Sequence, residues 1–149
     1  MRILIVEDDQ LTAELVREYL EPFSSKIYYA SSLERACQFC EHPEIDFDVI
    51  MLDLRLEDSN PDNTVDSISA LKSMQPDAAV LVMSGMSPVD RWREMSLNGG
   101  ADGFLYKDIS FSRQAIYMAV FAALGNRSSG NHSDTFLQNL KLLERLATS

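Results

Sequence analysis

The chain has 149 residues, of which 46% are hydrophobic and 24% are charged, so it can form one compact globular domain around a single core. Its formal net charge of −10 argues against a nucleic-acid-binding surface, because binding to a polyanion needs clustered Lys and Arg side chains. The first apolar run ends at Glu7, too early for a signal peptide or a membrane span. We therefore expect a cytoplasmic protein that contacts neither membrane nor nucleic acid directly.

Five short runs of aliphatic and aromatic residues predict β-strands. In chain order they cover residues 3–6, 26–29, 48–52, 79–83 and 103–106, and the second is the weakest. Apolarity that is continuous, without alternation, is typical of strands that are covered on both faces, as in a parallel sheet.

Segments with helical spacing of apolar residues follow each of these runs. The first begins near Leu11 and stops before Pro22, and the others cover residues 33–40, 65–74, 89–97 and 111–124. The Gly99-Gly100 pair is suited to ending the fourth helix. A strand followed by a helix, five times over, predicts an α/β fold of the flavodoxin-like (βα)5 type with a five-stranded parallel sheet.

The C-terminal part has a different composition. Residues 125–133 are mostly Gly, Ser and Asn with little to bury, so we expect a main domain over residues 1–124, followed by a linker and a short amphipathic helix within residues 125–149. The segment 115–124 is apolar nearly all round, and its outer face needs a cover. A second copy of the chain, a partner protein, or the stripe of Phe136, Leu140 and Leu143 could each supply that cover.

Cys37 and Cys40 form a C-x-x-C spacing within the second predicted helix. Three-residue spacing places both thiols on one apolar face, and the sequence shows no second pair of ligands. We therefore interpret these cysteines as packing residues.

Polar residues stand where the predicted strands end. Glu7, Asp8 and Asp9 follow the first strand, Asp53 the third, Ser84 the fourth and Lys107 the fifth. Ligands of open parallel sheets bind at this edge, and carboxylates crowded there favour a divalent cation such as Mg²⁺. The Lys107 ammonium and the Ser84 hydroxyl could bind phosphoryl oxygens. The pattern indicates phosphoryl transfer to a carboxylate.

Four sequence blocks resemble the signature of response regulator receiver domains from two-component, or phosphorelay, signalling systems. They are residues 3–8 with Leu11 beyond, residues 49–53, residues 82–85 and residues 100–107, and the resemblance extends from Arg2 to about Leu124. It implies a receiver-type (βα)5 domain.

The resemblance also implies roles for individual residues. Glu7, Asp8 and Asp53 would bind Mg²⁺ with the backbone carbonyl of Arg55, and Asp53 would accept the phosphoryl group. Ser84 and Lys107 would bind that group. Phe104 would be an aromatic switch residue that turns inward together with Ser84.

Such a domain takes its phosphoryl group from a sensor histidine kinase or a phosphotransfer protein. Its output would run through a downstream protein partner or a homodimer. Beyond self-catalysed transfer and slow autodephosphorylation we expect no enzymatic activity. Aspartyl phosphohydrolases would want an acid at position 55, where Arg stands, and dinucleotide-binding domains a Gly-rich turn after the first strand.

The sequence departs from the family pattern at two places beside the expected site. Asp108 follows Lys107, where Pro is usual and the peptide bond is commonly cis, so the geometry of this bond is open. Glu57 replaces a usual Pro, and residues 58–63 resemble a small insertion. An alternative function is therefore a pseudo-receiver that acts as a phosphorylation-independent interaction module.

Arg55 and Met86 stand two positions after Asp53 and Ser84, where related receivers flank the path of the water that attacks the phosphoryl group. Neither side chain can accept a hydrogen bond from that water as a carboxylate or amide would. We therefore expect a long-lived phosphorylated state.

Overall fold

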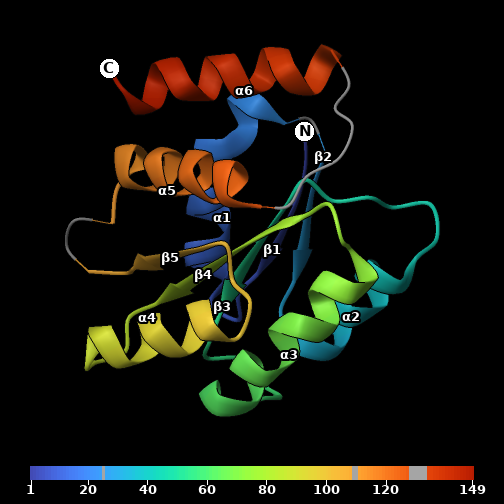
Figure 1. Cartoon of the computed structure of the whole chain (residues 1–149), viewed down its shortest axis with the longest axis vertical. Helices are drawn as coiled ribbons and strands as arrows, with labels where there is room; N and C mark the ends of the chain where they lie inside the picture. The colour runs from blue at the N-terminus through green and yellow to red at the C-terminus, as the bar shows by residue number, and fades with distance from the viewer. Residues whose placement is uncertain (25, 109–110, 128–133) are drawn as a thin grey trace.

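The computed structural model of the chain describes residues 1–24, 26–108, 111–127 and 134–149. Its centre is a parallel five-stranded sheet with strand order β2-β1-β3-β4-β5 (Figure 1). The strands are β1 (Arg2–Val6), β2 (Lys26–Ala30), β3 (Val49–Asp53), β4 (Ala79–Ser84) and β5 (Gly103–Tyr106). The flavodoxin-like arrangement expected from the sequence is confirmed.

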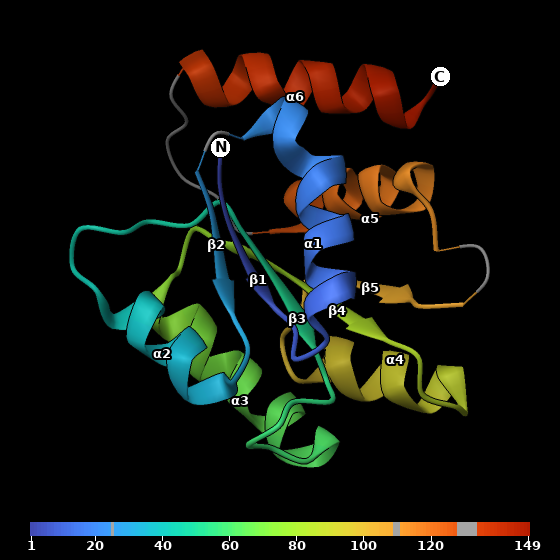
Figure 2. The ribbon, with the colours of Figure 1, turned by 180° about the vertical axis from the view of Figure 1, so that it is seen from behind.

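Helices cover both faces of this sheet. They are α1 (Gln10–Leu20), α2 (Leu33–Glu41), α3 (Pro61–Met74), α4 (Val89–Asn98) and α5 (Arg113–Asn126), with a 3-10 turn η1 (Glu21–Phe23) after α1. A further helix, α6 (Asp134–Ala147), follows α5 in the chain. Figures 1 and 2 show α1 and α5 on one face and α2, α3 and α4 on the other.

Alternate residues of the inner strands fill two separate cores. In β1, Ile3 and Ile5 join the cluster under α1 and α5, whereas Leu4 and Val6 join the cluster under α2, α3 and α4. The four side chains are at most 1% exposed. Burial on both faces explains why the strand runs are continuously apolar.

Three helix boundaries differ by two residues or more from the sequence-based expectation: α3 begins four residues early, and α5 begins and ends two residues late. Helix α3 begins at Pro61, four residues early, because the Asn60 side chain accepts a hydrogen bond from the Asn63 N–H at 2.9 Å and Pro suits the first helical turn. Helix α5 continues through Gly125 to Asn126, and the Arg127 N–H still donates to the carbonyl of Ala123. Residues 128–133 of the expected linker lie outside the described residues.

The expected stop of α4 is present. Gly100 follows the helix with a φ of +111°, a conformation that favours glycine because it has no Cβ. The peptide bond between Lys107 and Asp108 is trans, and the cis bond found in the described part of the chain is Ser87–Pro88.

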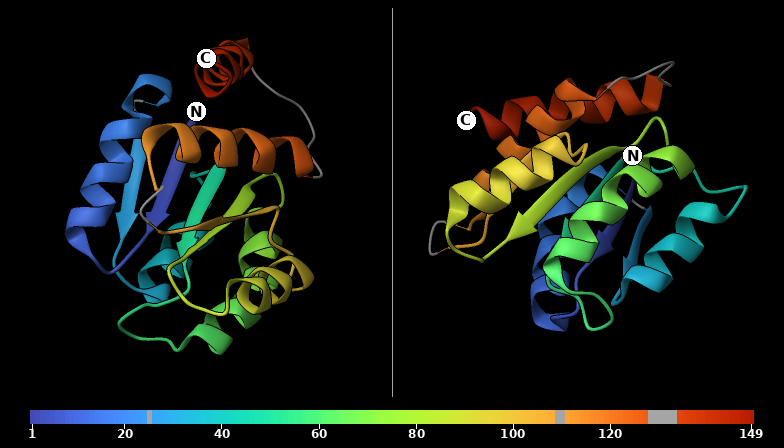
Figure 3. Two further views of the ribbon diagram at one scale, coloured as in Figure 1. Left: turned by 90° about the vertical axis from the view of Figure 1, so that its left-hand side faces the viewer. Right: turned by 60° about the horizontal axis from the view of Figure 1, so that its bottom comes forward.

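The cover of α5 is the C-terminal helix. Figure 3 shows α6 outside α5, and Phe136, Leu143 and Ala147 are buried in the same cluster as Ile116 and Val120 of α5. At the start of this layer the Arg127 guanidinium lies 4.8 Å from the centre of the Phe136 ring. Of the three covers considered, the structure shows the tail.

Both cysteines are free thiols. Burial, with smaller effects from the neighbouring Cys37 and Glu41, raises the pKa of Cys40 to about 12. Cys40 is therefore a protonated packing residue. Within the described ranges we find no helix whose length and apolarity would let it cross a membrane.

Candidate functional site

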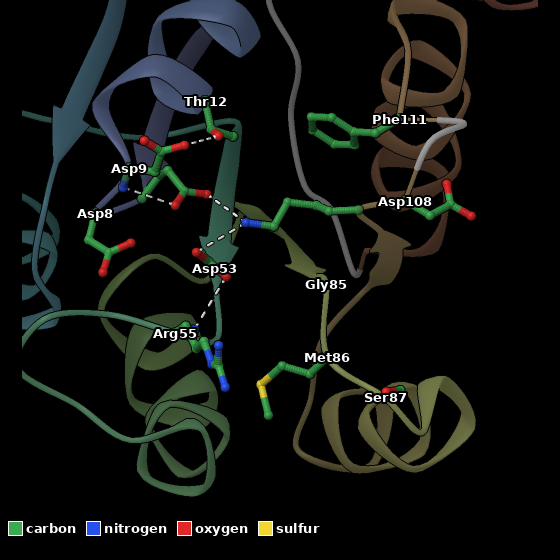
Figure 4. A pocket seen from close by; sticks show the side chains of 12 residues that line it. Asp8, Asp9, Thr12, Asp53, Arg55, Gly85, Met86, Ser87, Asp108 and Phe111 are labelled. Atoms are coloured by element: carbon green, nitrogen blue, oxygen red, sulfur yellow. Dashed lines mark hydrogen bonds and ion pairs between the residues drawn. The ribbon is translucent and has the colours of Figure 1, made fainter.

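The carboxyl ends of β1, β3 and β5 meet at an open depression of about 680 Å³ (Figure 4). Parallel strands bring these ends together at one edge, although the residues are up to 100 positions apart in the chain. The depression is lined by Glu7, Asp8, Asp9, Thr12, Asp53, Arg55, Gly85, Met86, Ser87, Lys107, Asp108 and Phe111.

Two buried carboxylates share one ammonium group at its floor. Glu7 is 1% exposed and Asp53 is 4% exposed. The Lys107 Nζ lies 3.0 Å from Glu7 Oε2 and 3.2 Å from Asp53 Oδ2. We call Glu7, Asp8, Asp53 and Lys107 the acidic site.

The charges of the acidic site are unbalanced, and the pKa values reflect this. Burial, together with the Asp53 carboxylate, raises the pKa of Glu7 to about 8 against the opposing effect of Lys107. Burial lowers the pKa of Lys107, but Asp53 and Glu7 outweigh this effect, and the net shift is upward. Without a further cation, Glu7 therefore holds a proton near neutral pH.

The donors of the acidic site fit a hard divalent cation. Glu7, Asp8 and Asp53 each offer one carboxylate oxygen, and these three atoms lie within 4.8 Å of one another. Mg²⁺ prefers oxygen ligands, tolerates retained water and is commonly held by one or two carboxylates. A bound cation would also relieve the repulsion that raises the pKa of Glu7.

The side chains of the other expected site residues, Arg55, Ser84 and Phe104, make no contact with the acidic site among the hydrogen bonds and ion pairs of the described residues. The Arg55 N–H donates to Asp53 Oδ1 at 3.3 Å, which brings its main chain beside the acidic site, while its side chain is exposed. Ser84 is 1% exposed, does not line the depression, and accepts a hydrogen bond from the Met86 N–H at 3.1 Å. Phe104 is half-buried against the α2–α4 core, with the Arg93 guanidinium 5.5 Å from its ring centre.

Sequence reasoning missed Thr12 and gave Asp9 no role in the site. The Asp9 side chain accepts a hydrogen bond from the Thr12 hydroxyl, and its N–H donates to Glu7 Oε1 at 3.1 Å. The hydrogen bond from Thr12 lowers the pKa of Asp9, with burial opposing it. Asp9 therefore contributes to the acidic site through its backbone N–H, which orients the Glu7 carboxylate, while its side chain stays exposed. An acid followed by Thr three positions later, at a helix start, was the available signal.

Comparison with known proteins agrees with this geometry. The family model of the response regulator receiver domain matches residues 3–119. Among curated relatives, the chain is 26% identical over 151 residues to a cyclic di-GMP phosphodiesterase of Thermotoga maritima. It is 25% identical over 138 residues to the cell cycle transcriptional regulator CtrA of Caulobacter vibrioides. The alignments cover 99% and 93% of this chain but only 38% and 55% of those proteins, so it spans roughly half or less of their length.

Solved structures show the same fold. A response regulator of Burkholderia pseudomallei, crystallised with a phosphorylated aspartic acid, a calcium ion and citrate, aligns with a TM-score of 0.67 at 21% identity, covering 96% of this chain and 74% of that one. The beryllofluoride-activated NtrC4 receiver domain dimer aligns with a TM-score of 0.67 at 27% identity over 83% of this chain and 96% of that one. Because the family model spans most of its length and its acidic residues meet at the expected edge, this chain belongs to the response regulator receiver domain family.

Proposed function

We propose that this domain accepts a phosphoryl group on Asp53 from the phosphohistidine of a sensor histidine kinase or phosphotransfer protein. The observation that carries the proposal is the Asp53 carboxylate itself. It is buried at the floor of an open depression, 3.2 Å from the Lys107 ammonium and beside two further acids. Receiver domains bind Mg²⁺ at an acidic pocket, and here Glu7, Asp8, Asp53 and the Arg55 carbonyl would hold the ion.

The chain's own groups have defined parts in this transfer. An Asp53 oxygen forms the new bond to phosphorus while the bond from phosphorus to the donor's imidazole nitrogen breaks, and that nitrogen keeps the electron pair. Lys107 lies where it can exchange its contact with Asp53 for a phosphoryl oxygen, which stabilises the charge that spreads over these oxygens. Bound Mg²⁺ would supply further neutralisation of the same charge.

Ser84 would join only after a local rearrangement. Its hydroxyl now accepts from the Met86 N–H and is buried. Rotation toward the phosphoryl group would change the β4–α4 connection, and the neighbouring aromatic Phe104 would follow it as the switch residue. The output is then a changed surface for a downstream protein partner or for a second copy of the chain. In this proposal the protein catalyses its own phosphorylation and slow dephosphorylation and no other reaction.

The test is incubation with Mg²⁺ and acetyl phosphate, followed by intact mass measurement. The wild-type chain should gain one phosphoryl group, and Asp53→Asn should gain none while keeping its fold, because only a charged, nucleophilic side chain is lost. Asp9→Asn is the matched control, since it removes an acid from the rim and should still be phosphorylated.

The competing function is a pseudo-receiver that keeps the fold as a constitutive interaction module. The replacement of the usual Pro by Asp108 is the observation that favours it. Absence of phosphorylation in wild type, together with no response of Trp92 fluorescence to beryllofluoride and Mg²⁺, would support the pseudo-receiver. Phosphate incorporated by Asp53→Asn would instead show that another residue is the acceptor.

A further inference from the structure

The main chain that leaves Asp53 is fixed at two points. On the strand side, the Leu54 N–H donates to the carbonyl of Met83 at 3.3 Å and the Arg55 N–H donates to Asp53 Oδ1. On the far side the chain closes a tight turn over residues 56–59, in which the Ser59 N–H donates to the carbonyl of Leu56 at 3.3 Å. Arg55 lies between these points, so the turn helps to set where its carbonyl can point.

The side chain of Asp58, in this turn, is hydrogen-bonded to the N-terminus of α2. The Asp58 carboxylate accepts hydrogen bonds from the backbone N–H groups of Leu33 at 2.8 Å and Glu34 at 3.0 Å, both in the first turn of α2. Beside it, Glu57 Oε1 accepts from the Ser31 hydroxyl at 3.3 Å. The first N–H groups of a helix have no partner within the helix, and a carboxylate there gains from charge as well as from hydrogen bonding.

The segment that contacts this turn is also connected to the strand that carries Glu7. Ser31 directly follows β2, and the last residue of β2, Ala30, accepts a hydrogen bond from the Glu7 N–H at 3.0 Å. The turn is therefore tied to the same pair of strands that carries Glu7. The helix has its own cap in addition, because the Ser32 hydroxyl accepts from the Arg35 N–H at 3.1 Å.

We propose that Asp58 is a positioning residue for the metal site: by clamping the 56–59 turn to the N-terminus of α2, it holds the main chain of Arg55 beside Asp53. The inference rests on the proposed function, in which the Arg55 carbonyl is a ligand of Mg²⁺. Asp58 lies in the segment that departs from the family pattern, and the clamp gives that segment a role. A preorganised ligand binds its ion more tightly because less freedom is lost on binding.

The test is calorimetric titration of Mg²⁺ into the full chain without any phosphodonor. Asp58→Ala should weaken Mg²⁺ binding about three- to tenfold, below the loss of about ten- to a hundredfold typical of groups that contact a metal ligand directly. Asp58→Asn keeps one of the two accepting oxygens, and with it one of the two hydrogen bonds from the helix, so it should weaken Mg²⁺ binding by only about twofold, less than Asp58→Ala. Both variants remove the same charge, so the difference between them reports the hydrogen bonds.

Two control variants separate positioning from other effects. Ser32→Ala removes the helix's own cap and lowers the melting temperature, but it leaves the clamp in place and should not change Mg²⁺ affinity. Asp66→Asn removes an exposed acid from α3 and controls for net charge. Phosphorylation of Asp58→Ala by acetyl phosphate should be slow at low Mg²⁺ and return to the wild-type rate when Mg²⁺ is saturating, because only the affinity for the ion is altered.

The Mg²⁺ affinities of these variants distinguish positioning by Asp58 from an effect of charge. Equal weakening in Asp58→Ala and Asp58→Asn would reduce the effect to charge and overturn the inference, as would equal weakening by Ser32→Ala. Normal Mg²⁺ binding by wild type with no change in Asp58→Ala would overturn the inference alone. Absence of Mg²⁺ binding by wild type would overturn the proposed function together with the inference.

Discussion

The acidic site joins side chains from distant parts of the chain, whereas the α5–α6 layer packs two consecutive helices together, and the chemistry of the two regions is opposite. The acidic site buries Glu7 and Asp53 around a single ammonium group and is short of positive charge. The α5–α6 layer buries Phe136, Leu143 and Ala147 against apolar partners. One region carries unbalanced negative charge beside a single ammonium group, whereas the other is apolar.

This difference implies a division of labour. Substitutions in the acidic site should change ligand binding and phosphoryl chemistry while the fold persists. Substitutions in the α5–α6 layer should change stability while the chemistry persists, because no residue of the depression belongs to α6. A variant of the α5–α6 layer that altered phosphoryl chemistry while still folded would contradict this division.

Removal of residues 128–149 should have the largest effect on stability. It uncovers the apolar outer side of α5 and removes Phe136 and Leu143 from the core. The loss of two large core side chains, offset by the freedom that the released tail regains, suggests a cost of roughly 3–6 kcal/mol and a tendency to associate. Chemical denaturation and size-exclusion chromatography would measure both. Unchanged stability and oligomeric state would argue against the tail as the cover of α5.

A single substitution in α6 tests the same contribution to stability. Leu143 is 0% exposed, and Leu143→Ala should cost about 3 kcal/mol of unfolding free energy. Leu137 lies on the same helix but is 40% exposed, so Leu137→Ala should cost less than about 0.5 kcal/mol. Phosphorylation by acetyl phosphate should proceed at the wild-type rate in both. A large rate loss in Leu143→Ala, at a temperature where it is fully folded, would show that the two regions are coupled.

In the acidic site, Met86→Glu should shorten the life of the phosphorylated state. A carboxylate there can accept a hydrogen bond from the attacking water and orient it, and about tenfold faster hydrolysis corresponds to about 1.4 kcal/mol of barrier. Arg55→Asn should accelerate hydrolysis by less. Met86→Leu is the control, since it has similar size and no acceptor. Loss of phosphate within seconds in wild type, or slower loss in both Met86→Glu and Arg55→Asn, would contradict this prediction.

The sequence carried most of the fold and only part of the site. The strands were predictable because burial on both faces leaves continuous apolar runs such as Ile3 to Val6. The approach of Glu7, Asp53 and Lys107 followed from their positions at strand ends. The start of α3 was missed although Asn60 and Pro61 carry recognised capping signals. The contacts of Asp58 could not be foreseen, because its partners are backbone N–H groups 24 and 25 residues away, which leave no mark on the side-chain pattern.

The hydrogen bond that the Ser84 hydroxyl accepts from the Met86 N–H also could not be predicted from the sequence. A hydroxyl can accept from a nearby backbone N–H or donate to a ligand, and the residue type does not choose between these options. The exposed side chain of Arg55 is a similar case: it makes no ion pair with Glu57 in the described part of the chain, and Glu57 accepts from Ser31 instead.

The smallest expected effect concerns a single proton in the acidic site. Because the pKa of Glu7 is raised to about 8 from an ordinary value of 4.5, folded metal-free protein keeps this proton near pH 7 whereas the unfolded chain does not. Its contribution to stability is therefore complete below about pH 4.5 and is lost as the pH rises towards 8. Mg²⁺ needs the ionised carboxylate, so binding near pH 7 should release close to one proton, and the affinity should rise with pH and level off above about pH 8.

Calorimetric titrations of Mg²⁺ in buffers of different ionisation enthalpy would count the released protons. Glu7→Gln should abolish the release and weaken binding, whereas Leu143→Ala should leave the proton count unchanged, because the α5–α6 layer holds no group of the acidic site. Mg²⁺ binding without proton release near pH 7 would mean that Glu7 is already ionised. The rise in the pKa of Glu7 caused by burial and by Asp53 would then be smaller than its position in the acidic site implies.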